Sequence, residues 1–234
     1  MTLRVDLLAI CLFFGALLWL IWRRDRRRAR AVRGAYFEDC RHLLEDEHIH
    51  RQGFGFPVLE GRYRGHRVRL EPVVDHMAVR KLPSLWILVS VFGDPPVPGA
   101  VDFLVRPQNT EFYSPSARLP VSLPIPADWP RHALLRTDIE EGAPPLELLA
   151  PHMHLFADER MKELLLTPRG VRLVYQASQG ERAYYMVLRQ PEFGPARLPA
   201  ELARRLLDQA VAILDSAARH RGGGPAGRRE AQLT

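Results

Sequence analysis

The chain is poor in lysine and in cysteine. Lys81 and Lys162 are the only lysines among 33 basic residues, a usage that indicates a GC-rich, bacterial genome. Of the two cysteines, Cys11 lies in an apolar run and Cys40 follows it, which argues against a disulfide between them. This usage fits a reduced, cytoplasmic setting. Cys40 could serve as a redox or acylation site, but a small buried core residue is expected.

Motifs that identify common enzyme classes are also missing. The chain has no G-x-x-x-x-G-K-[ST] loop, no G-x-S-x-G elbow, no H-E-x-x-H and no paired C-x-x-C. Sequence support is therefore lacking for a phosphate-binding loop, a serine hydrolase elbow or a thiolate zinc site. We assign no catalytic, cofactor-binding or metal-ligating residue and expect no cofactor.

Histidines near carboxylates are the remaining candidates for a site. They fall into three groups: Glu45, Glu47, His48 and His50; His152, His154, Asp158 and Glu159; and Asp75 with His76. Such ligands suit zinc or iron. Histidines two residues apart on a helix point to different faces, however, which argues against a metal site at either pair. The Asp75–His76 pair is expected in a solvated turn at a strand end.

The positive charge of the chain lies at its two ends. The formal net charge is +6, and residues 23–33 alone carry seven arginines and one aspartate. Residues 219–234 are also basic, whereas residues 34–218 are slightly acidic. A nucleic-acid-binding domain usually carries clustered positive charge on its folded body, so no nucleic acid partner is expected.

A long uncharged apolar run opens the chain. It extends from Leu7 to Trp22 and stops at the arginine cluster that begins at Arg23. As a helix it is about 24 Å long, slightly short of a bilayer core, and Trp19 and Trp22 suit the interface. The run predicts a single transmembrane helix in the bacterial inner membrane. The arginine excess predicts an outer amino terminus and a cytoplasmic domain.

Two other interpretations of this run are weaker. A cleaved signal peptide has its positive charge before the apolar region, whereas here the charge follows it, although Ala29-Arg30-Ala31 resembles a cleavage site. A helix lying on the membrane surface has one polar face, but this run is apolar all round. Arginines after a span also attract anionic lipid headgroups, so the lipid bilayer is the first expected partner.

The remaining pattern predicts one α+β domain with a mostly antiparallel sheet and a carboxy-terminal amphipathic helix. The expected divisions are an anchor at 1–33, a helical stalk at 34–52, the domain at 53–220 and a disordered tail at 221–234. The alternation at Val58–Tyr63 and His66–Val74 predicts a hairpin around Arg64-Gly65. Leu85–Phe92 is almost continuously apolar and predicts a central strand.

Prolines punctuate the middle of the chain, between residues 95 and 151, and predict loops and extended edge segments there. Val101–Val105 is one expected strand, and a short helix is expected at residues 146–156. A second hairpin is predicted from 171–176 and 183–189. The final helix has Pro199 in its first turn, an apolar stripe on one side, and glycines after it.

Two hypotheses for function follow from these patterns. The first is a tethered, non-enzymatic domain that binds a protein partner in an assembly or regulatory role, because tethering raises its effective concentration at the membrane. Loop aromatics Phe112, Tyr113 and Trp129 are the expected contact residues, unless they pack on the sheet. The alternative is a membrane-surface enzyme that uses the histidines and carboxylates, which would require a cleft that brings them together.

Overall fold

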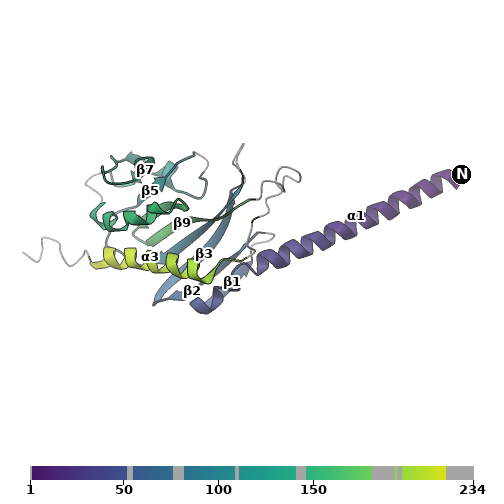
Figure 1. The fold of residues 1–234 in the computed structure, drawn as a ribbon, viewed down its shortest axis with the longest axis horizontal. Helices are drawn as coiled ribbons and strands as arrows, with labels where there is room; N and C mark the ends of the chain where they lie inside the picture. Colours follow the sequence, from purple (N-terminus) through teal and green to yellow (C-terminus); the bar gives the residue numbers. More distant parts are fainter. Residues whose placement is uncertain are drawn as a thin grey trace, which may run out of the picture.

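A computed structural model describes residues 2–51, 55–75, 82–108, 111–140, 146–180, 193 and 197–219. In helix α1 (Thr2–Gly34) it describes side chains from Leu12 onward, apart from Ala29. Figure 1 shows α1 extending away from a body formed by the rest of the described chain. The amino-terminal part of the chain therefore forms a long helix attached to a separate folded body.

The body is built on a nine-stranded antiparallel sheet in the order β1-β2-β3-β4-β9-β8-β5-β7-β6. The strands are β1 (Glu45–Arg51), β2 (Pro57–Tyr63), β3 (His66–Asp75), β4 (Ser84–Phe92), β5 (Val101–Val105), β6 (Val121–Ser122), β7 (Ala133–Thr137), β8 (Met161–Thr167) and β9 (Gly170–Gln179). With helix α3 (Ala200–Arg219) on the sheet, this arrangement confirms the predicted α+β class.

The hairpin and the central strand agree with the sequence prediction. β2 and β3 pair around Arg64 and Gly65, whose φ angles of 50° and 81° suit the tight two-residue turn of a hairpin. β4 lies inside the sheet between β3 and β9, and its predominantly apolar sequence buries side chains on both faces. The expected strand at Val101–Val105 is β5, but it is internal rather than an edge.

The helical stalk predicted at 34–52 is wrong. α1 ends at Gly34, and after a turn and a short 3₁₀ segment the chain forms edge strand β1. The apolar residues that resembled a helical stripe include Tyr36, Phe37 and Cys40, all buried in the main core. Tertiary burial of these side chains, together with the weak helix position at Gly34, outweighs the local periodicity.

The second hairpin has a different partner strand from the one predicted. β9 contains the expected strand at 171–176 but pairs with the preceding strand β8, around the turn at Pro168 and Arg169. Gly170 closes this turn with φ 136°, and a Cβ there would lie 2.1 Å from the Val91 carbonyl oxygen. Residues 183–189 lie outside the described residues. The helix expected at 146–156 is instead two 3₁₀ segments, η3 (Leu146–Leu148) and η4 (Ala150–Ala157).

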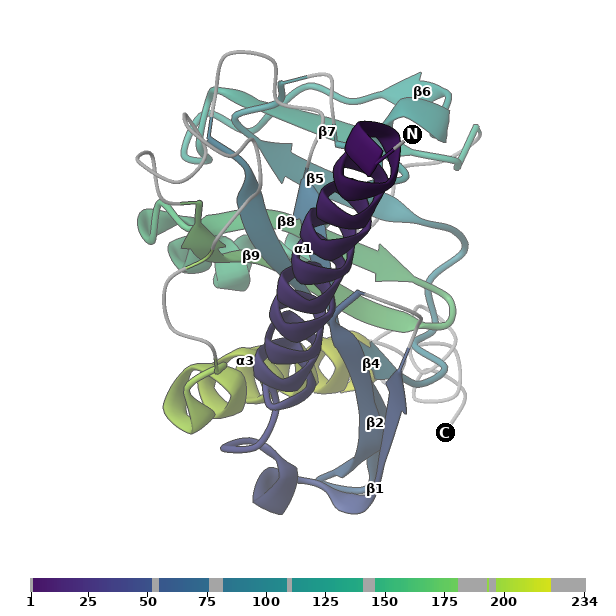
Figure 2. The ribbon, with the colours of Figure 1, turned by 90° about the vertical axis from the view of Figure 1, so that its right-hand side faces the viewer.

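Helix α3 covers one face of the sheet, here called the helix face (Figure 2). Its buried residues include Leu206, Ala210, Ile213 and Leu214 from the predicted apolar stripe. Together with η4 they pack on alternate residues of the strands, such as Ile87 of β4. This burial forms the main hydrophobic core and confirms the prediction for the terminal helix.

The opposite face is covered over its middle strands by residues 111–120, here called the strap, and is called the strap face. One apolar cluster on this face consists of Trp86, Leu88, Tyr113 and Val174, with Val73 at its margin. Leu104 of β5 and Leu165 of β8 are also buried on this face, opposite Glu163 and Asp102 in register. The two faces of one sheet therefore have different chemistry.

In the described part of the chain, no helix combines the length and the apolar character needed to cross a membrane. The membrane span expected at 7–22 therefore stays a prediction.

Candidate functional site

His48 and His50 lie on edge strand β1, not on a helix. Residues two apart on a strand share a face, so these two imidazoles point to the same side of the sheet. His50 Nε2 lies 3.6 Å from Glu60 Oε2, and His48 Nδ1 lies 2.7 Å from the carbonyl oxygen of Asp46. His50 therefore meets a carboxylate of the neighbouring strand, whereas His48 contacts the backbone of its own strand.

His152 and His154 lie on η4 and turn to different partners. His152 Nε2 is 3.1 Å from Ser216 Oγ on α3, and His154 Nδ1 is 2.9 Å from the Pro151 carbonyl oxygen. Partial burial, and to a smaller extent the neighbouring His154, lower the pKa of His152. The pair is thus divided between a contact with α3 and a contact within its own segment.

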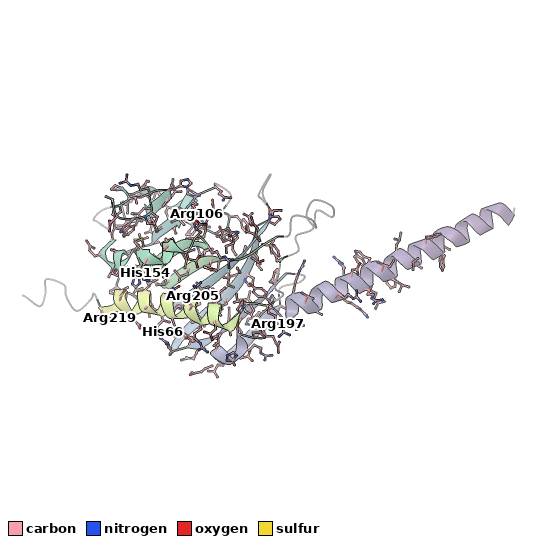
Figure 3. All side chains as sticks on the ribbon, in the orientation of Figure 1. His66, Arg106, His154, Arg197, Arg205 and Arg219 are labelled. Atoms are coloured by element: carbon pink, nitrogen blue, oxygen red, sulfur yellow. The ribbon has the colours of Figure 1, made fainter. Side chains whose placement is uncertain are left out.

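The carboxylates after these histidines point elsewhere. Asp158 accepts hydrogen bonds from the Tyr175 hydroxyl at 3.0 Å and from Arg205 at 3.3 Å. Glu159 is exposed. Figure 3 shows His154 on one side of α3 and His66 on the other. The described histidines are therefore dispersed around the body.

Among the described residues, no group of three or more histidine, cysteine, aspartate and glutamate side chains could hold a metal ion. Asp75 is buried at the end of β3, whereas a solvated turn was expected there. His76 lies outside the described residues, so this pair stays a prediction.

Cys40 is a buried core residue, as expected. Its thiol donates a hydrogen bond of 3.1 Å to the Leu198 carbonyl oxygen. Burial, with a smaller contribution from Asp39, raises the pKa of Cys40 to about 12. A thiol held protonated in this way is a poor nucleophile at neutral pH.

The three loop aromatics have different environments. Trp129 is buried and packs edge-on against Phe103, with ring centroids 5.2 Å apart. Tyr113 is buried under the strap against Trp86, at 5.6 Å. Phe112 is 55% exposed and contacts only the edge of the Tyr113 ring among the aromatic pairs. Of the described large apolar side chains outside α1, it is the most exposed.

Beneath the strap lies a polar cluster that the sequence analysis missed. Asp102 of β5 and Glu163 of β8 are fully buried on the strap face. Ser114 Oγ of the strap lies 3.1 Å from Glu163 Oε1 and 3.5 Å from Asp102 Oδ2. Arg172 of β9 donates to Glu163 Oε1 at 3.2 Å. These side chains tie the strap to three strands of the sheet.

A buried ion pair holds the start of the strap. Lys162 Nζ lies 2.8 Å from Glu111 Oε1, and both side chains are less than 10% exposed. Lys162 also donates to the Arg106 carbonyl oxygen at 2.6 Å. Burial lowers the pKa of Lys162, although Glu111 opposes this effect. The strap is therefore fixed at two points, by an ion pair and by the serine contacts to the carboxyl pair.

The sequence contains a weak signal for these groups. Asp102 interrupts the apolar strand VDFLV, and Lys162 and Glu163 open the apolar strand MKELLLT. A charged residue inside an apolar strand is costly to bury unless it is paired. That cost points to partners elsewhere in the chain but does not identify them.

Comparison of the chain with protein-family models, curated proteins and solved structures gives no match.

Proposed function

We propose that this is a single-pass protein of the bacterial inner membrane whose cytoplasmic α+β domain binds a protein partner beside the membrane. The observation that supports the anchor is the exposure of α1. Its large apolar side chains between Leu12 and Trp22 are 41% to 67% exposed. A contiguous apolar surface of this kind is stable in water only when something covers it.

The boundary of this apolar surface has features of a membrane interface. Arg23 lies over the Trp19 ring at 5.0 Å, and Arg26 lies over the Trp22 ring at 4.3 Å. Amphipathic tryptophan rings next to guanidinium groups suit the headgroup region. The proposed span uses the full apolar run from Leu7 in the sequence, which begins before the described side chains.

The position of the strap supports the proposal that the partner is also at the membrane. A Cβ at Gly34, where α1 ends, would lie 3.6 Å from the Arg51 guanidinium, so α1 leaves from the end of the sheet where β1 ends. β4 begins at this same end, and Tyr113 of the strap packs on Trp86, its third residue. Phe112, next to Tyr113 in the chain, therefore belongs to the part of the strap that lies at this end of the sheet. An exposed aromatic ring on a fixed loop is a typical interface anchor.

The test is co-purification of the full chain, tagged at its carboxy terminus, from gently solubilised membranes. We expect a stoichiometric protein partner that is lost with Phe112→Ser and kept with Arg118→Ser, an exposed change in the same strap. Both variants should unfold at the wild-type denaturant midpoint. Equal partner recovery by both variants would contradict the assignment of Phe112.

The anchor is tested separately by alkaline extraction of membranes that contain the full chain. An integral protein stays in the pellet, with its carboxy-terminal tag protected from protease in intact spheroplasts. Release into the supernatant would contradict the span, and digestion of the tag would contradict the orientation.

A further inference from the structure

The carboxyl groups of Asp102 and Glu163 are adjacent and enclosed. Both residues are 0% exposed, and one hydroxyl, Ser114 Oγ, lies 3.1 Å from Glu163 Oε1 and 3.5 Å from Asp102 Oδ2, so the two carboxyl groups meet at the same point. A hydrogen bond between two carboxyl groups requires a proton on one of them. In a dry interior, two adjacent carboxylates without that proton repel strongly.

The surrounding charges do not neutralise two carboxylates. From β9, Arg172 contacts Glu163 alone by an ion pair. From β7, Arg136 lies opposite Asp102 in register but donates its described hydrogen bond to the Leu119 carbonyl oxygen, at 3.3 Å. The neighbouring lysine of β8 is already paired with the carboxylate at the start of the strap. One guanidinium thus faces two acidic groups.

The strap contributes hydroxyls rather than charge. Ser114 contacts both carboxyl groups, and its own Oγ accepts a hydrogen bond from the Ser116 backbone N–H at 3.1 Å. Asp102 Oδ1 and Glu163 Oε2 are buried and have no hydrogen-bond partner among the described atoms. Buried oxygens left in this state indicate that the site takes up a small positively charged or donating species.

We infer that Asp102 and Glu163 share one proton at neutral pH and that this proton latches the strap, and with it the Phe112 surface, onto the sheet. The inference concerns regulation of the proposed partner surface and rests on that proposal for its biological meaning. The smallest species that meets the charge deficit is the proton itself. Arg172 and Arg136 on either side disfavour a metal cation.

Loss of the proton has a defined consequence. Base removes it to solvent and leaves two carboxylates beside one guanidinium. The closest groups that can move are those of the strap, because the carboxyl groups themselves are on paired strands. We therefore expect the strap to open in alkaline solution while the sheet stays intact.

The test is amide hydrogen exchange of the full chain in detergent micelles between pH 6 and pH 10, corrected for intrinsic exchange chemistry. Strap amides such as Ser116 and Leu119 should lose at least tenfold protection as the pH rises, while amides of β4 and β9 keep theirs. Asp102→Asn and Glu163→Gln each remove the ionisation but keep hydrogen-bonding groups, so each should flatten the profile. Glu60→Gln changes a carboxylate on the same sheet face that is 36% exposed; it is the matched control and should behave as wild type.

A flat wild-type profile would overturn the latch, and this outcome needs no variant to fold. Loss of protection in β4 and β9 together with the strap would also overturn it, because the whole domain would then be opening. Excess calcium or magnesium is added in a parallel series. Restored strap protection in wild type but not in Asp102→Asn would identify a metal site in place of the proton. None of these measurements uses the partner, so the latch and the proposed function can fail independently.

Discussion

The helix face and the strap face of the sheet are both buried, but different kinds of residue bury them. On the helix face, α3 and η4 cover leucine, isoleucine, valine and phenylalanine side chains. On the strap face, a few aromatic and aliphatic residues are joined by paired charges and serine hydroxyls. Apolar burial tolerates many similar arrangements, whereas polar burial requires particular partners. The helix face thus supplies most of the stability, and the strap face fixes one specific loop position.

The strongest test of this comparison is Phe103→Ala on the helix face. Phe103 is fully buried and packs on Trp129 and Phe156, with the latter ring centroid at 4.9 Å. Its truncation should lower the free energy of unfolding by about 4 kcal/mol, because it leaves a cavity among rings that cannot all collapse. Denaturant titration of the full chain in detergent measures this loss. A change below about 1 kcal/mol would mean that the helix face is loosely packed.

On the strap face, Lys162→Met should cost about 3 kcal/mol, because Glu111 loses its ion-pair partner in a buried position. The double variant Glu111→Gln with Lys162→Met should recover part of that loss, since neither residue of the pair then carries a buried charge. The same titration measures both. Glu111→Gln is measured alone as well. If the loss of unfolding free energy in the double variant equals the sum of the losses in Lys162→Met and Glu111→Gln, the two side chains do not act as a pair.

The pH dependence of stability distinguishes the faces further. Burial, and then Glu163, raise the pKa of Asp102 well above its usual value of about 3.9. The folded state therefore binds more protons than the unfolded state above that value. The free energy of unfolding should fall as the pH rises from about 4 through the folded-state pKa, by at most about 1.4 kcal/mol per pH unit.

Asp102→Asn should remove this slope and be more stable than wild type at pH 8. Unfolding midpoints at several pH values check the prediction. Midpoints that run parallel for the two proteins would show that another group produces the slope.

The smallest expected effect is at His152, beside the helix face. Its lowered pKa means that acid favours the unfolded state, so stability falls as the pH drops through about 6.5. The side chain is only partly buried, which keeps the loss below about 1 kcal/mol. His152→Gln should remove it while keeping a polar group near Ser216. If the free energy of unfolding of the variant differs between pH 7 and pH 5 by as much as that of wild type, His152 is not the source of the loss.

These two faces also explain what the sequence could and could not predict. The buried strand at Leu85–Phe92 is predictable from its nearly continuous apolar run, and the buried side of α3 from its apolar stripe. The turn at Arg64-Gly65 is predictable from its residue types. The pairing of β9 with β8 depends on the turn at Pro168 and Arg169. In the sequence, the later turn residues at 178–180 predict a hairpin equally well.

The strap cluster depends on contacts between distant segments. Ser114 and Glu163 are 49 residues apart, and Lys162 and Glu111 are 51 apart. No local pattern joins such residues. The same limit applies to residues 34–52, where Phe37 and Cys40 follow a helical spacing but are positioned by burial against the rest of the domain. Local rules therefore predicted the central strand and the terminal helix, whereas tertiary contacts determined the strap face and the position of residues 34–52.

The unbroken course of α1 to Gly34 gives the protein a fixed angular register. The 12 residues from Arg23 to Gly34 extend about 18 Å as a helix at about 1.5 Å per residue. Within such a rod, one inserted residue moves the domain by about 1.5 Å but turns it by about 100° around the axis. The direction in which Phe112 faces is therefore set by the number of residues in this segment, far more than its distance from the apolar end of the helix.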